Sequence, residues 1–199
     1  MGHGPGLARV HWHAATMQAF HPASKVVMSS FEVRPATARD AKEVAQIHVA
    51  AWQSAYQGIM PAEDLAALSV AKREAIWKEA IEYAEPQLLV ATEAGNIVGF
   101  VGFDRSRDKG TPATTGEIWA LYAAPDHWGK DLGLALWDAA LEACIEEGFT
   151  SLTLWVLLRN ERALRFFEAA GFKRDMPSIK TVQMGTVRLE EIRLKRPIA

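Results

Sequence analysis

The sequence predicts one α/β domain with a mixed sheet, and three observations predict it. Apolar residues make up 49% of a chain of 199 residues, which is enough for one sizeable core. Short segments with the period of a strand are interleaved with longer segments that have the period of a helix. From residue 118 onwards strands and helices alternate, which favours parallel pairing, whereas short turns elsewhere favour antiparallel hairpins. The expected sheet is therefore mixed.

Each expected element follows from its local pattern. Strands are assigned to segments that alternate, or to short apolar runs bounded by turn residues. Helices are assigned where apolar residues recur every three or four positions; Thr37 or Asp40 can cap the first and Asn160 the last, which ends at Gly171. In chain order we expect a strand at 31–34, a helix that ends before Gly58, a helix at 61–83, strands at 87–92, 97–104 and 118–122, a helix that opens near Leu132, a strand at 152–157, a helix after Asn160, and strands at 179–184 and 186–194.

One edge of the first helix is aromatic. His48, Trp52 and Tyr56 stand at i, i+4 and i+8, so they share one helix edge. Such an edge can pack into the core, or it can form the wall of a substrate pocket, because the helix stops directly afterwards. Both interpretations stay open.

Charge and composition argue against several classes of function. The net charge of −2 gives no bulk electrostatic reason to expect a nucleic acid or an anionic membrane as a partner. No run approaches the roughly 18 apolar residues that a membrane span needs. The single cysteine, Cys144, lies on an apolar helix face, so we expect a small core residue. No secretory signal pattern is present, and we expect a cytoplasmic protein.

Residues 1–30 differ in composition from the rest of the chain. They hold three Gly, two Pro and four of the six His, without a clean period. The histidine spacing matches no zinc pattern, and no Cys or carboxylate joins it, so we expect no metal site. We interpret 1–30 as a flexible or loosely docked extension and 31–199 as the domain.

The segment between the expected strand at 118–122 and the helix after it carries the clearest chemical signal. Gly129 and Gly133 stand in a turn that leads from a strand into a helix. This geometry aims backbone N–H groups, at the positive end of the helix dipole, towards one point, which suits a phosphate or pyrophosphate. Taken alone, the turn is equally consistent with a structural strand-to-helix corner.

Two segments carry a resemblance to the GNAT superfamily of N-acetyltransferases. The segment 121–136, LYAAPDHWGKDLGLAL, is similar to the acyl-CoA pyrophosphate loop of that family. The segment 160–172, NERALRFFEAAGF, is similar to its Asn-x-x-Ala-x-x-Phe-Tyr-x-x-x-Gly-Phe segment and is the more specific match. The resemblance covers about residues 31–197. It implies a mostly antiparallel, twisted mixed sheet of about six or seven strands, with about four helices on its two faces.

The resemblance also implies a reaction and a set of site residues. The reaction is transfer of an acetyl group from acetyl-CoA, as co-substrate, to the primary amine of a small molecule or peptide. Glu117 is implied as the base, although an exposed carboxylate at a strand start is the open alternative. The acceptor amine is expected beside His48, Trp52, Tyr56 and the loop at 105–116. The implied acetyl-CoA contacts are Leu121, Tyr122, Ala123, Trp128, Gly129, Lys130, Asp131, Leu132, Gly133, Leu134, Asn160, Ala163, Phe166 and Phe167.

Asp131 is one departure from the family pattern, because it stands where the family has the first glycine of its loop. Trp128 likewise replaces a Gln or Arg. Two like charges about 4 Å apart repel by roughly 1 kcal/mol in bulk water and about 4 kcal/mol at an effective dielectric of 20. If the position needs a positive φ, a residue other than Gly costs on the order of another 1–2 kcal/mol. Lys130 can offset part of the charge.

Phe167 is the other departure, because the family has a tyrosine there that is thought to protonate the CoA thiolate. Loss of a general acid typically costs about 10²–10⁴-fold in rate. Tyr122 or Tyr56 can take that role on residue type, and we assign Tyr122 as catalytic. The two departures also support an alternative, a catalytically impaired acyl-CoA-binding or structural module. Members of the family often pair, so a homodimer is a further expectation.

Overall fold

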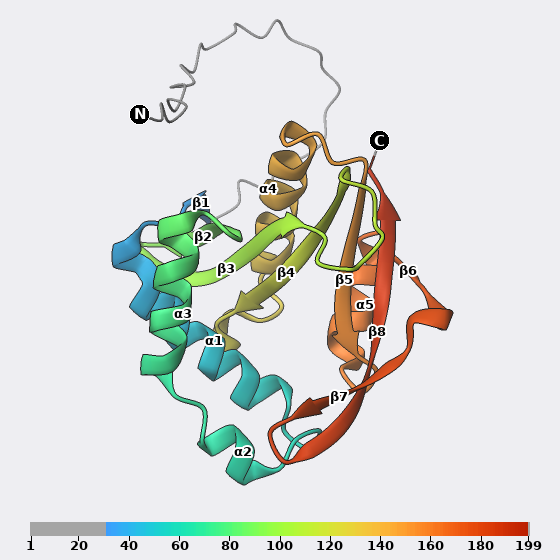
Figure 1. The fold of residues 1–199 in the computed structure, drawn as a ribbon. Helices are drawn as coiled ribbons and strands as arrows, with labels where there is room; N and C mark the ends of the chain where they lie inside the picture. The colour runs from blue at the N-terminus through green and yellow to red at the C-terminus, as the bar shows by residue number, and fades with distance from the viewer. Residues whose placement is uncertain (1–30, 199) are drawn as a thin grey trace, which may run out of the picture.

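The computed structural model describes residues 31–198, and the expected extension at 1–30 lies outside them. The described part of the chain has eight strands, which form one sheet, and five helices. The helices lie on both sides of the sheet (Figure 1). The elements are β1 (Glu32–Pro35), α1 (Ala41–Ala55), α2 (Ala62–Ala66), α3 (Val70–Tyr83), β2 (Gln87–Glu93), β3 (Asn96–Arg105), β4 (Thr115–Ala123), α4 (Leu132–Glu146), β5 (Ser151–Leu157), α5 (Glu161–Ala169), β6 (Lys173–Arg174), β7 (Lys180–Met184) and β8 (Val187–Pro197). Short 3-10 turns occupy Ala38–Asp40, Pro125–His127 and Met176–Ser178.

The sheet has the strand order β1-β2-β3-β4-β5-β8-β6, and β7 pairs with β8. Only β4 and β5 run parallel; every other pair described is antiparallel. The mixed, mostly antiparallel sheet is confirmed. One strand and one helix exceed the expected numbers, because β6 has only two residues and because the helix expected at 61–83 is interrupted.

The interruption lies between α2 and α3. The hydroxyl of Ser69 accepts a hydrogen bond from the N–H of Lys72 at 3.3 Å, so a new helix begins at Val70. An N-cap serine gives the backbone an alternative to continuing the preceding helix.

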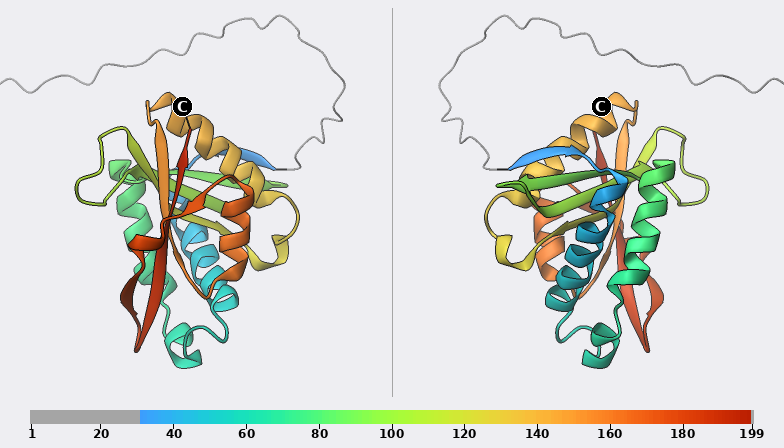
Figure 2. Two further views of the ribbon diagram at one scale, coloured as in Figure 1. Left: turned by 90° about the vertical axis from the view of Figure 1, so that its right-hand side faces the viewer. Right: turned by 90° about the vertical axis from the view of Figure 1, so that its left-hand side faces the viewer.

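The helices divide between the two faces of the sheet, with α1 and α3 on one face and α4 and α5 on the other (Figures 1 and 2). Each face has its own apolar core. The core under α4 and α5 includes Phe103, Leu132, Leu136, Cys144, Leu154, Leu164 and Ile192, and the core under α1 and α3 includes Val44, Ile47, Trp77, Val90 and Phe100. Cys144 is fully buried, as expected, and burial raises the pKa of its thiol to about 12.

The parallel pair β4–β5 comes apart after its first three residues. Pairing runs from Thr115 opposite Ser151 to Glu117 opposite Thr153, and then ends, although both strands continue. On its other side β4 has a bulge, since Ile118 pairs with Phe103 and Ala120 with Gly102, which leaves Trp119 as the extra residue. A bulge bends a strand and increases its twist. The bend separates β4 from β5, and this separation makes room for the site.

Candidate active site

A cavity of about 550 Å³ lies between the diverging parts of β4 and β5. Residues 118–123 of β4 and 154–157 of β5 line it. The loop before α4 and the first turns of α4 and α5 line it from one face of the sheet, and the end of α1 lines it from the other. A cavity of this size can hold a small-molecule ligand.

The loop that leads into α4 presents a row of free backbone N–H groups. We call residues 129–134 the N–H loop. None of its N–H groups donates to a protein acceptor within the described chain. The N–H of Trp128, which was expected among these donors, is different, because it donates to the carbonyl of Pro125 at 3.3 Å. Free N–H groups at a helix N-terminus form an anion site, and four residues of this loop line the cavity.

Asp131 is the N-cap of α4 and has a left-handed backbone, with φ 61°. This is the conformation for which a glycine would be preferred, although Asp tolerates it better than most residues. Its side chain accepts no capping hydrogen bond, and the residue lines the cavity. The structure therefore combines a strained backbone with a carboxylate at the anion site.

Trp128 and Arg162 form a stacked pair beside the N–H loop. The indole N–H of Trp128 donates to the carbonyl of Ala123 at 3.0 Å, and the guanidinium carbon of Arg162 lies 4.0 Å from the ring centroid. Both residues line the cavity, and no described carboxylate pairs with this arginine. Partial burial lowers its pKa. Arg162 thus places a positive charge at the anion site. The sequence analysis did not predict this role, because Arg162 occupies an exposed helix position with no distinctive pattern.

The start of α5 closes the cavity beside α4. The two helices lie close together because residue 133 has no side chain: a Cβ on Gly133 would stand 3.1 Å from the ring of Phe166. Phe166 and Phe167 contact each other edge to face, with centroids 5.1 Å apart, and both line the cavity. Asn160 caps α5 by accepting the N–H of Ala163 at 3.2 Å, and it also lines the cavity.

Glu117 lies inside the protein at the point where β4 and β5 separate, with 1% of its side chain exposed. This rules out the alternative of an exposed carboxylate at a strand start. One oxygen accepts the backbone N–H of Arg107 at 2.9 Å, and the other accepts Nε at 3.1 Å and Nη2 of the same arginine. The side chain of Arg107 is itself 54% exposed. Within residues 31–198 this buried carboxylate thus has a single ionic partner, Arg107, which comes from the loop between β3 and β4.

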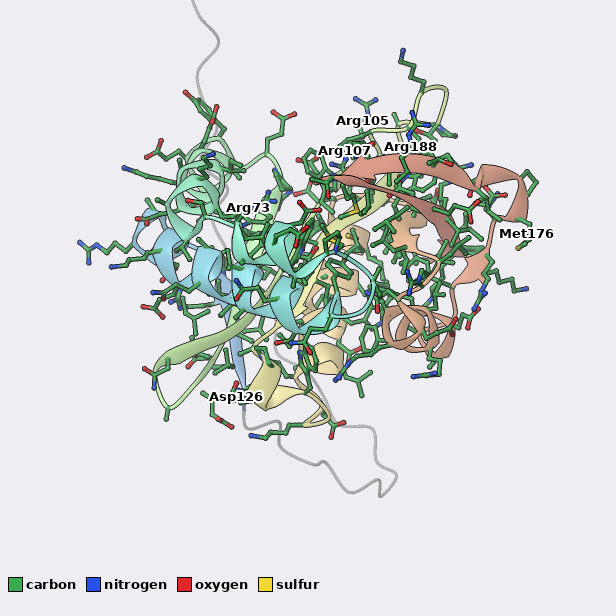
Figure 3. All side chains as sticks on the ribbon, turned by 90° about the horizontal axis from the view of Figure 1, so that it is seen from below. Arg73, Arg105, Arg107, Asp126, Met176 and Arg188 are labelled. Atoms are coloured by element: carbon green, nitrogen blue, oxygen red, sulfur yellow. The ribbon has the colours of Figure 1, made fainter. Side chains whose placement is uncertain are left out.

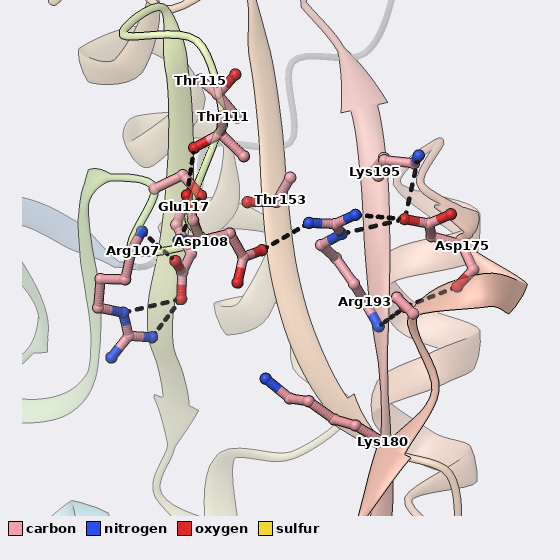
Figure 4. A network of polar contacts seen from close by, with 12 residues as sticks. Arg107, Asp108, Thr111, Thr115, Glu117, Thr153, Asp175, Lys180, Arg193 and Lys195 are labelled. Atoms are coloured by element: carbon pink, nitrogen blue, oxygen red, sulfur yellow. Dashed lines mark hydrogen bonds and ion pairs between the residues drawn. The ribbon is translucent and has the colours of Figure 1, made fainter.

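A chain of ion pairs continues from that loop across the open face of the sheet (Figure 4). Asp108 accepts Nη1 of Arg193 on β8 at 2.8 Å, and Arg193 also donates Nη2 to Asp175 at 2.7 Å. Lys195 reaches the same carboxylate of Asp175 at 3.1 Å. The loop is therefore attached to β4 through one residue and to β8 through the next. Seen from below, Arg73, Arg105 and Arg107 lie in the upper part of the view, and Asp126, in the turn after β4, lies in its lower part (Figure 3).

Tyr122 connects the aromatic edge of α1 to the cavity. Its hydroxyl accepts the indole N–H of Trp52 at 2.9 Å, and it also interacts with the hydroxyl of Tyr56, which in turn interacts with Asn160. Burial raises the pKa of both tyrosines, so both keep their protons at neutral pH. Tyr56 and Tyr122 line the cavity, whereas Trp52 lies behind them.

His48 lies in the core and does not line the cavity, contrary to its expected place in the acceptor site. Its Nδ1 accepts the indole N–H of Trp77 at 3.0 Å, and its ring stacks on Tyr122 with centroids 4.9 Å apart. Its Nε2 has no partner within the described residues. Burial, with a smaller effect from the charge of Arg73, lowers the pKa of His48 to about 3.

The structure brings most of the predicted residues together around the cavity. Apart from His48 and Trp52, the exceptions are Glu117, Lys130, which is exposed, and Leu132, whose side chain is buried in the core under α4 and α5. The sequence analysis did not single out several residues that line the cavity or contact the base, among them Arg107, Trp119, His127 and Arg162. His127 contacts Asp126 at 2.8 Å and Glu93 at 3.0 Å, which raises its pKa.

Residues 31–198 contain neither a candidate metal site nor a candidate membrane span. No group of three His, Cys, Asp or Glu side chains there could hold a metal ion. None of the helices in the same range is long and apolar enough to cross a membrane.

A model of the acetyltransferase (GNAT) family matches residues 41–172, a span that holds the N–H loop, the diverging strands and α5. The chain belongs to the acetyltransferase (GNAT) family. The fold class, the family and the enzyme class that the sequence predicts are thereby confirmed.

Relatives of known sequence include other N-acetyltransferases. YuaI of Bacillus subtilis, an uncharacterised N-acetyltransferase, is 28% identical over 167 residues, which are 83% of this chain and 92% of that protein. A mycothiol acetyltransferase of Propionibacterium freudenreichii is 37% identical over 131 residues, which are 65% of this chain but only 38% of that protein.

Solved structures of this family share the fold. The GCN5-related N-acetyltransferase of Rhodopseudomonas palustris has a TM-score of 0.68 at 27% identity, over 87% of this chain and 99% of that one. The PaiA N-acetyltransferase of Thermoplasma acidophilum, solved with coenzyme A, has a TM-score of 0.67 at 18% identity, over 84% and 98% of the two chains. At that identity the second likeness concerns the fold alone.

Proposed function

We propose that this GNAT protein is an acetyl-CoA-dependent N-acetyltransferase that acetylates the primary amine of a small molecule or peptide by direct attack on the thioester. The observation that carries the proposal is the N–H loop, whose free donors stand at the edge of a cavity between two diverging strands. Free donors at a helix N-terminus are the usual protein partner of a phosphate or pyrophosphate.

The residues around the cavity suit the two ends of acetyl-CoA. The N–H loop and Arg162 would hold the pyrophosphate, and the pantetheine arm would pass along Asn160, Ala163 and the two phenylalanines of α5. Acetyl-CoA supplies a thioester carbonyl that is activated for attack by an amine. Solved relatives contain coenzyme A or acetyl-CoA, as in PaiA of Thermoplasma acidophilum and YncA of Salmonella typhimurium.

Glu117 would act as the base that frees the amine for attack. A primary amine arrives largely as an ammonium ion at neutral pH, because its pKa lies near 10. Its proton would pass to Glu117 directly or through a water molecule. Backbone N–H groups at Leu121 to Ala123 would polarise the carbonyl, as oxyanion donors do in other acyl transfers.

Tyr122 would supply the proton that the CoA thiolate needs. Tyr122 lines the cavity, and the hydrogen bond that its hydroxyl accepts from Trp52 does not use the tyrosine's own proton, which would be donated to the thiolate. Phe167, at the family position for this role, has no proton to give. The attacking nitrogen would lose a second proton when the amide forms. In the overall reaction this proton balances the one that Tyr122 gives to the thiolate.

The finer features of the proposal rest on sequence patterns. The acceptor would lie against Tyr56 and the loop between β3 and β4, with Trp52 and His48 as support behind Tyr56 and Tyr122. The cytoplasmic location and the homodimer stay predictions.

A non-catalytic acyl-CoA-binding module is the second candidate. It is favoured by the carboxylate of Asp131 at the anion site and by the absence of a hydroxyl on Phe167. Both candidates bind acetyl-CoA, so turnover separates them.

Isothermal titration of acetyl-CoA into the purified protein is the first test. We expect micromolar affinity. No binding at millimolar ligand would contradict both the acetyl-CoA site and the proposed activity. Release of CoA is then followed with a panel of primary amines. Binding without release with any amine would favour the module.

Glu117→Gln tests the base, with Glu43→Gln on the exposed side of α1 as its matched control. We expect the first variant to bind acetyl-CoA as the parent does and to lose about 10²–10⁴-fold in kcat, the usual range for a general base. Full activity in Glu117→Gln would show that this carboxylate is not the base.

A further inference from the structure

We propose that the Glu117 carboxylate and the Trp119 ring form the cation site that receives the acceptor as an alkylammonium ion, and that Arg107 occupies this site until the acceptor displaces it. The inference rests on the proposed function and names the acceptor class and an unassigned specificity residue. We call Glu117 and Trp119 together the cation site.

The composition of the site is the first argument. The guanidinium of Arg107 contacts the carboxylate of Glu117 on one side, and its carbon lies 4.0 Å from the centroid of Trp119 on the other. A carboxylate beside the face of an indole binds organic cations, by ionic hydrogen bonds and by cation–π attraction. Glu117 and Trp119 therefore have the composition of a cation site, and the guanidinium of Arg107 occupies it.

The position of the site is the second argument. Glu117 is the last residue of β4 that pairs with β5, and Trp119 lines the cavity that opens directly after it. A cation held between these two side chains would stand beside that cavity, because Trp119 lines it while Glu117 and Arg107 do not. An amine that passes its proton directly to Glu117 has to approach the carboxylate oxygen that the guanidinium now contacts, as the dashed lines show (Figure 4).

The attachment of the loop is the third argument, because it lets the side chain of Arg107 leave while the loop stays in place. Asp108 holds the loop to Arg193 of β8 at 2.8 Å. The backbone N–H of Arg107 holds it to Glu117 at 2.9 Å, and this bond does not need the guanidinium. More than half of the Arg107 side chain already contacts solvent. Displacement thus needs a rotation of one side chain.

A buried carboxylate cannot be left without a partner at low cost, which explains why the site contains a cation at all. It also sets the selectivity. An acceptor that arrives as an alkylammonium ion replaces the guanidinium charge for charge, whereas a neutral acceptor would leave Glu117 unpaired. The site therefore favours aliphatic amines over weakly basic aromatic amines, which are neutral at pH 7.

The test is the binding of n-butylammonium chloride, as the probe, to Arg107→Ala in the full chain at constant ionic strength. We expect calorimetry to show at least tenfold tighter binding than in the parent protein, with a change in tryptophan fluorescence. Arg105→Ala is the matched control, since Arg105 is exposed, lies two residues away and has no ion pair within the described chain. Binding to Arg107→Ala no tighter than to Arg105→Ala would overturn the inference.

Two further variants keep the test decisive. In Arg107→Ala with Glu117→Gln the extra binding should disappear, and binding that survives would place the cation elsewhere and overturn the inference. If Arg107→Ala does not fold, Arg107→Lys replaces it, because lysine keeps the charge but cannot make the paired contacts of a guanidinium; we expect it to bind the probe more tightly than the parent does. Loss of probe binding with intact acetyl-CoA binding would overturn this inference alone, whereas loss of acetyl-CoA binding would overturn the proposed function.

Discussion

Asp131 shows how one residue can work against the site that contains it. The left-handed backbone at this position keeps the N–H loop open, yet the residue that adopts it is not the glycine that the geometry favours. Asp131 belongs to the N–H loop and lines the cavity, and the adjacent Lys130 and the stacked Arg162 can offset part of its charge. The strength of cofactor binding should therefore respond to this side chain more than to its neighbours.

Asp131→Gly should bind acetyl-CoA about tenfold or more tightly than the parent, because it removes a like charge worth on the order of 1–4 kcal/mol at about 4 Å. It should also raise the free energy of unfolding by up to about 1 kcal/mol, since glycine adopts this φ without strain. Calorimetry and urea denaturation measure the two effects.

Asp131→Asn separates the two causes. It removes the charge but keeps a side chain in the left-handed region, so it should gain affinity and little stability. Affinity that stays at the parent's level in both variants would mean that the carboxylate never faces the bound anion.

The first turn of α4, at the scale of the element, could be located from the sequence because its signal is local. Gly129, Gly133 and the helical period that follows them are neighbours in the chain, and the N–H loop depends on little else. The break before α3 was not predicted, because the apolar period continues across Ser69 and a single capping hydroxyl outweighs it.

The divergence of β4 from β5 could not be predicted from the sequence of either strand. It follows from the bulge at Trp119, and that bulge exists only in the register of β4 against β3. The contact between Arg107 and Glu117 depends likewise on how a polar loop lies over a strand. Residues that meet only through pairing between distant segments leave no local pattern.

Gly116 lies in the short segment where β4 and β5 are still paired. A Cβ there would stand 2.7 Å from Phe149 and 2.8 Å from Leu152, closer than side chains tolerate. Gly116→Ala should therefore lower the free energy of unfolding by about 1–3 kcal/mol, the usual cost of overpacking. Urea denaturation measures it.

Gly116→Ala combined with Phe149→Leu is the companion experiment, because the smaller side chain provides room for the new methyl group. The double variant should lose less than the sum of the two single changes. Strict additivity would show that the close contact at Gly116 is not the source of the loss.

The pH dependence of stability is a property of the whole molecule, and His48 contributes to it from the core between the sheet and α1. Its pKa is about 3 in the folded protein and near 6.5 in the unfolded chain, so below pH 6.5 protonation favours the unfolded state. The contribution of neutral His48 to the free energy of unfolding is fully present above about pH 6.5 and is lost progressively as the pH falls towards 3.

His48→Gln should remove that part of the pH dependence. Between pH 7 and pH 5 the parent should lose about 2 kcal/mol more free energy of unfolding than the variant does, from the linkage of one such group. Urea denaturation of both proteins at the two pH values gives the difference. Equal losses would mean that His48 takes up its proton in the folded protein as readily as in the unfolded chain.

The guanidinium that covers Glu117 also has a consequence for an enzyme that waits with its acyl donor already bound. A thioester beside an uncovered carboxylate could be hydrolysed, because the same base that prepares an amine can activate a water molecule. With Arg107 in place, both carboxylate oxygens are already engaged and hidden from solvent. The arrangement would let the protein hold acetyl-CoA without hydrolysing its thioester. Removal of the guanidinium should therefore reveal a slow hydrolysis of acetyl-CoA that needs no acceptor.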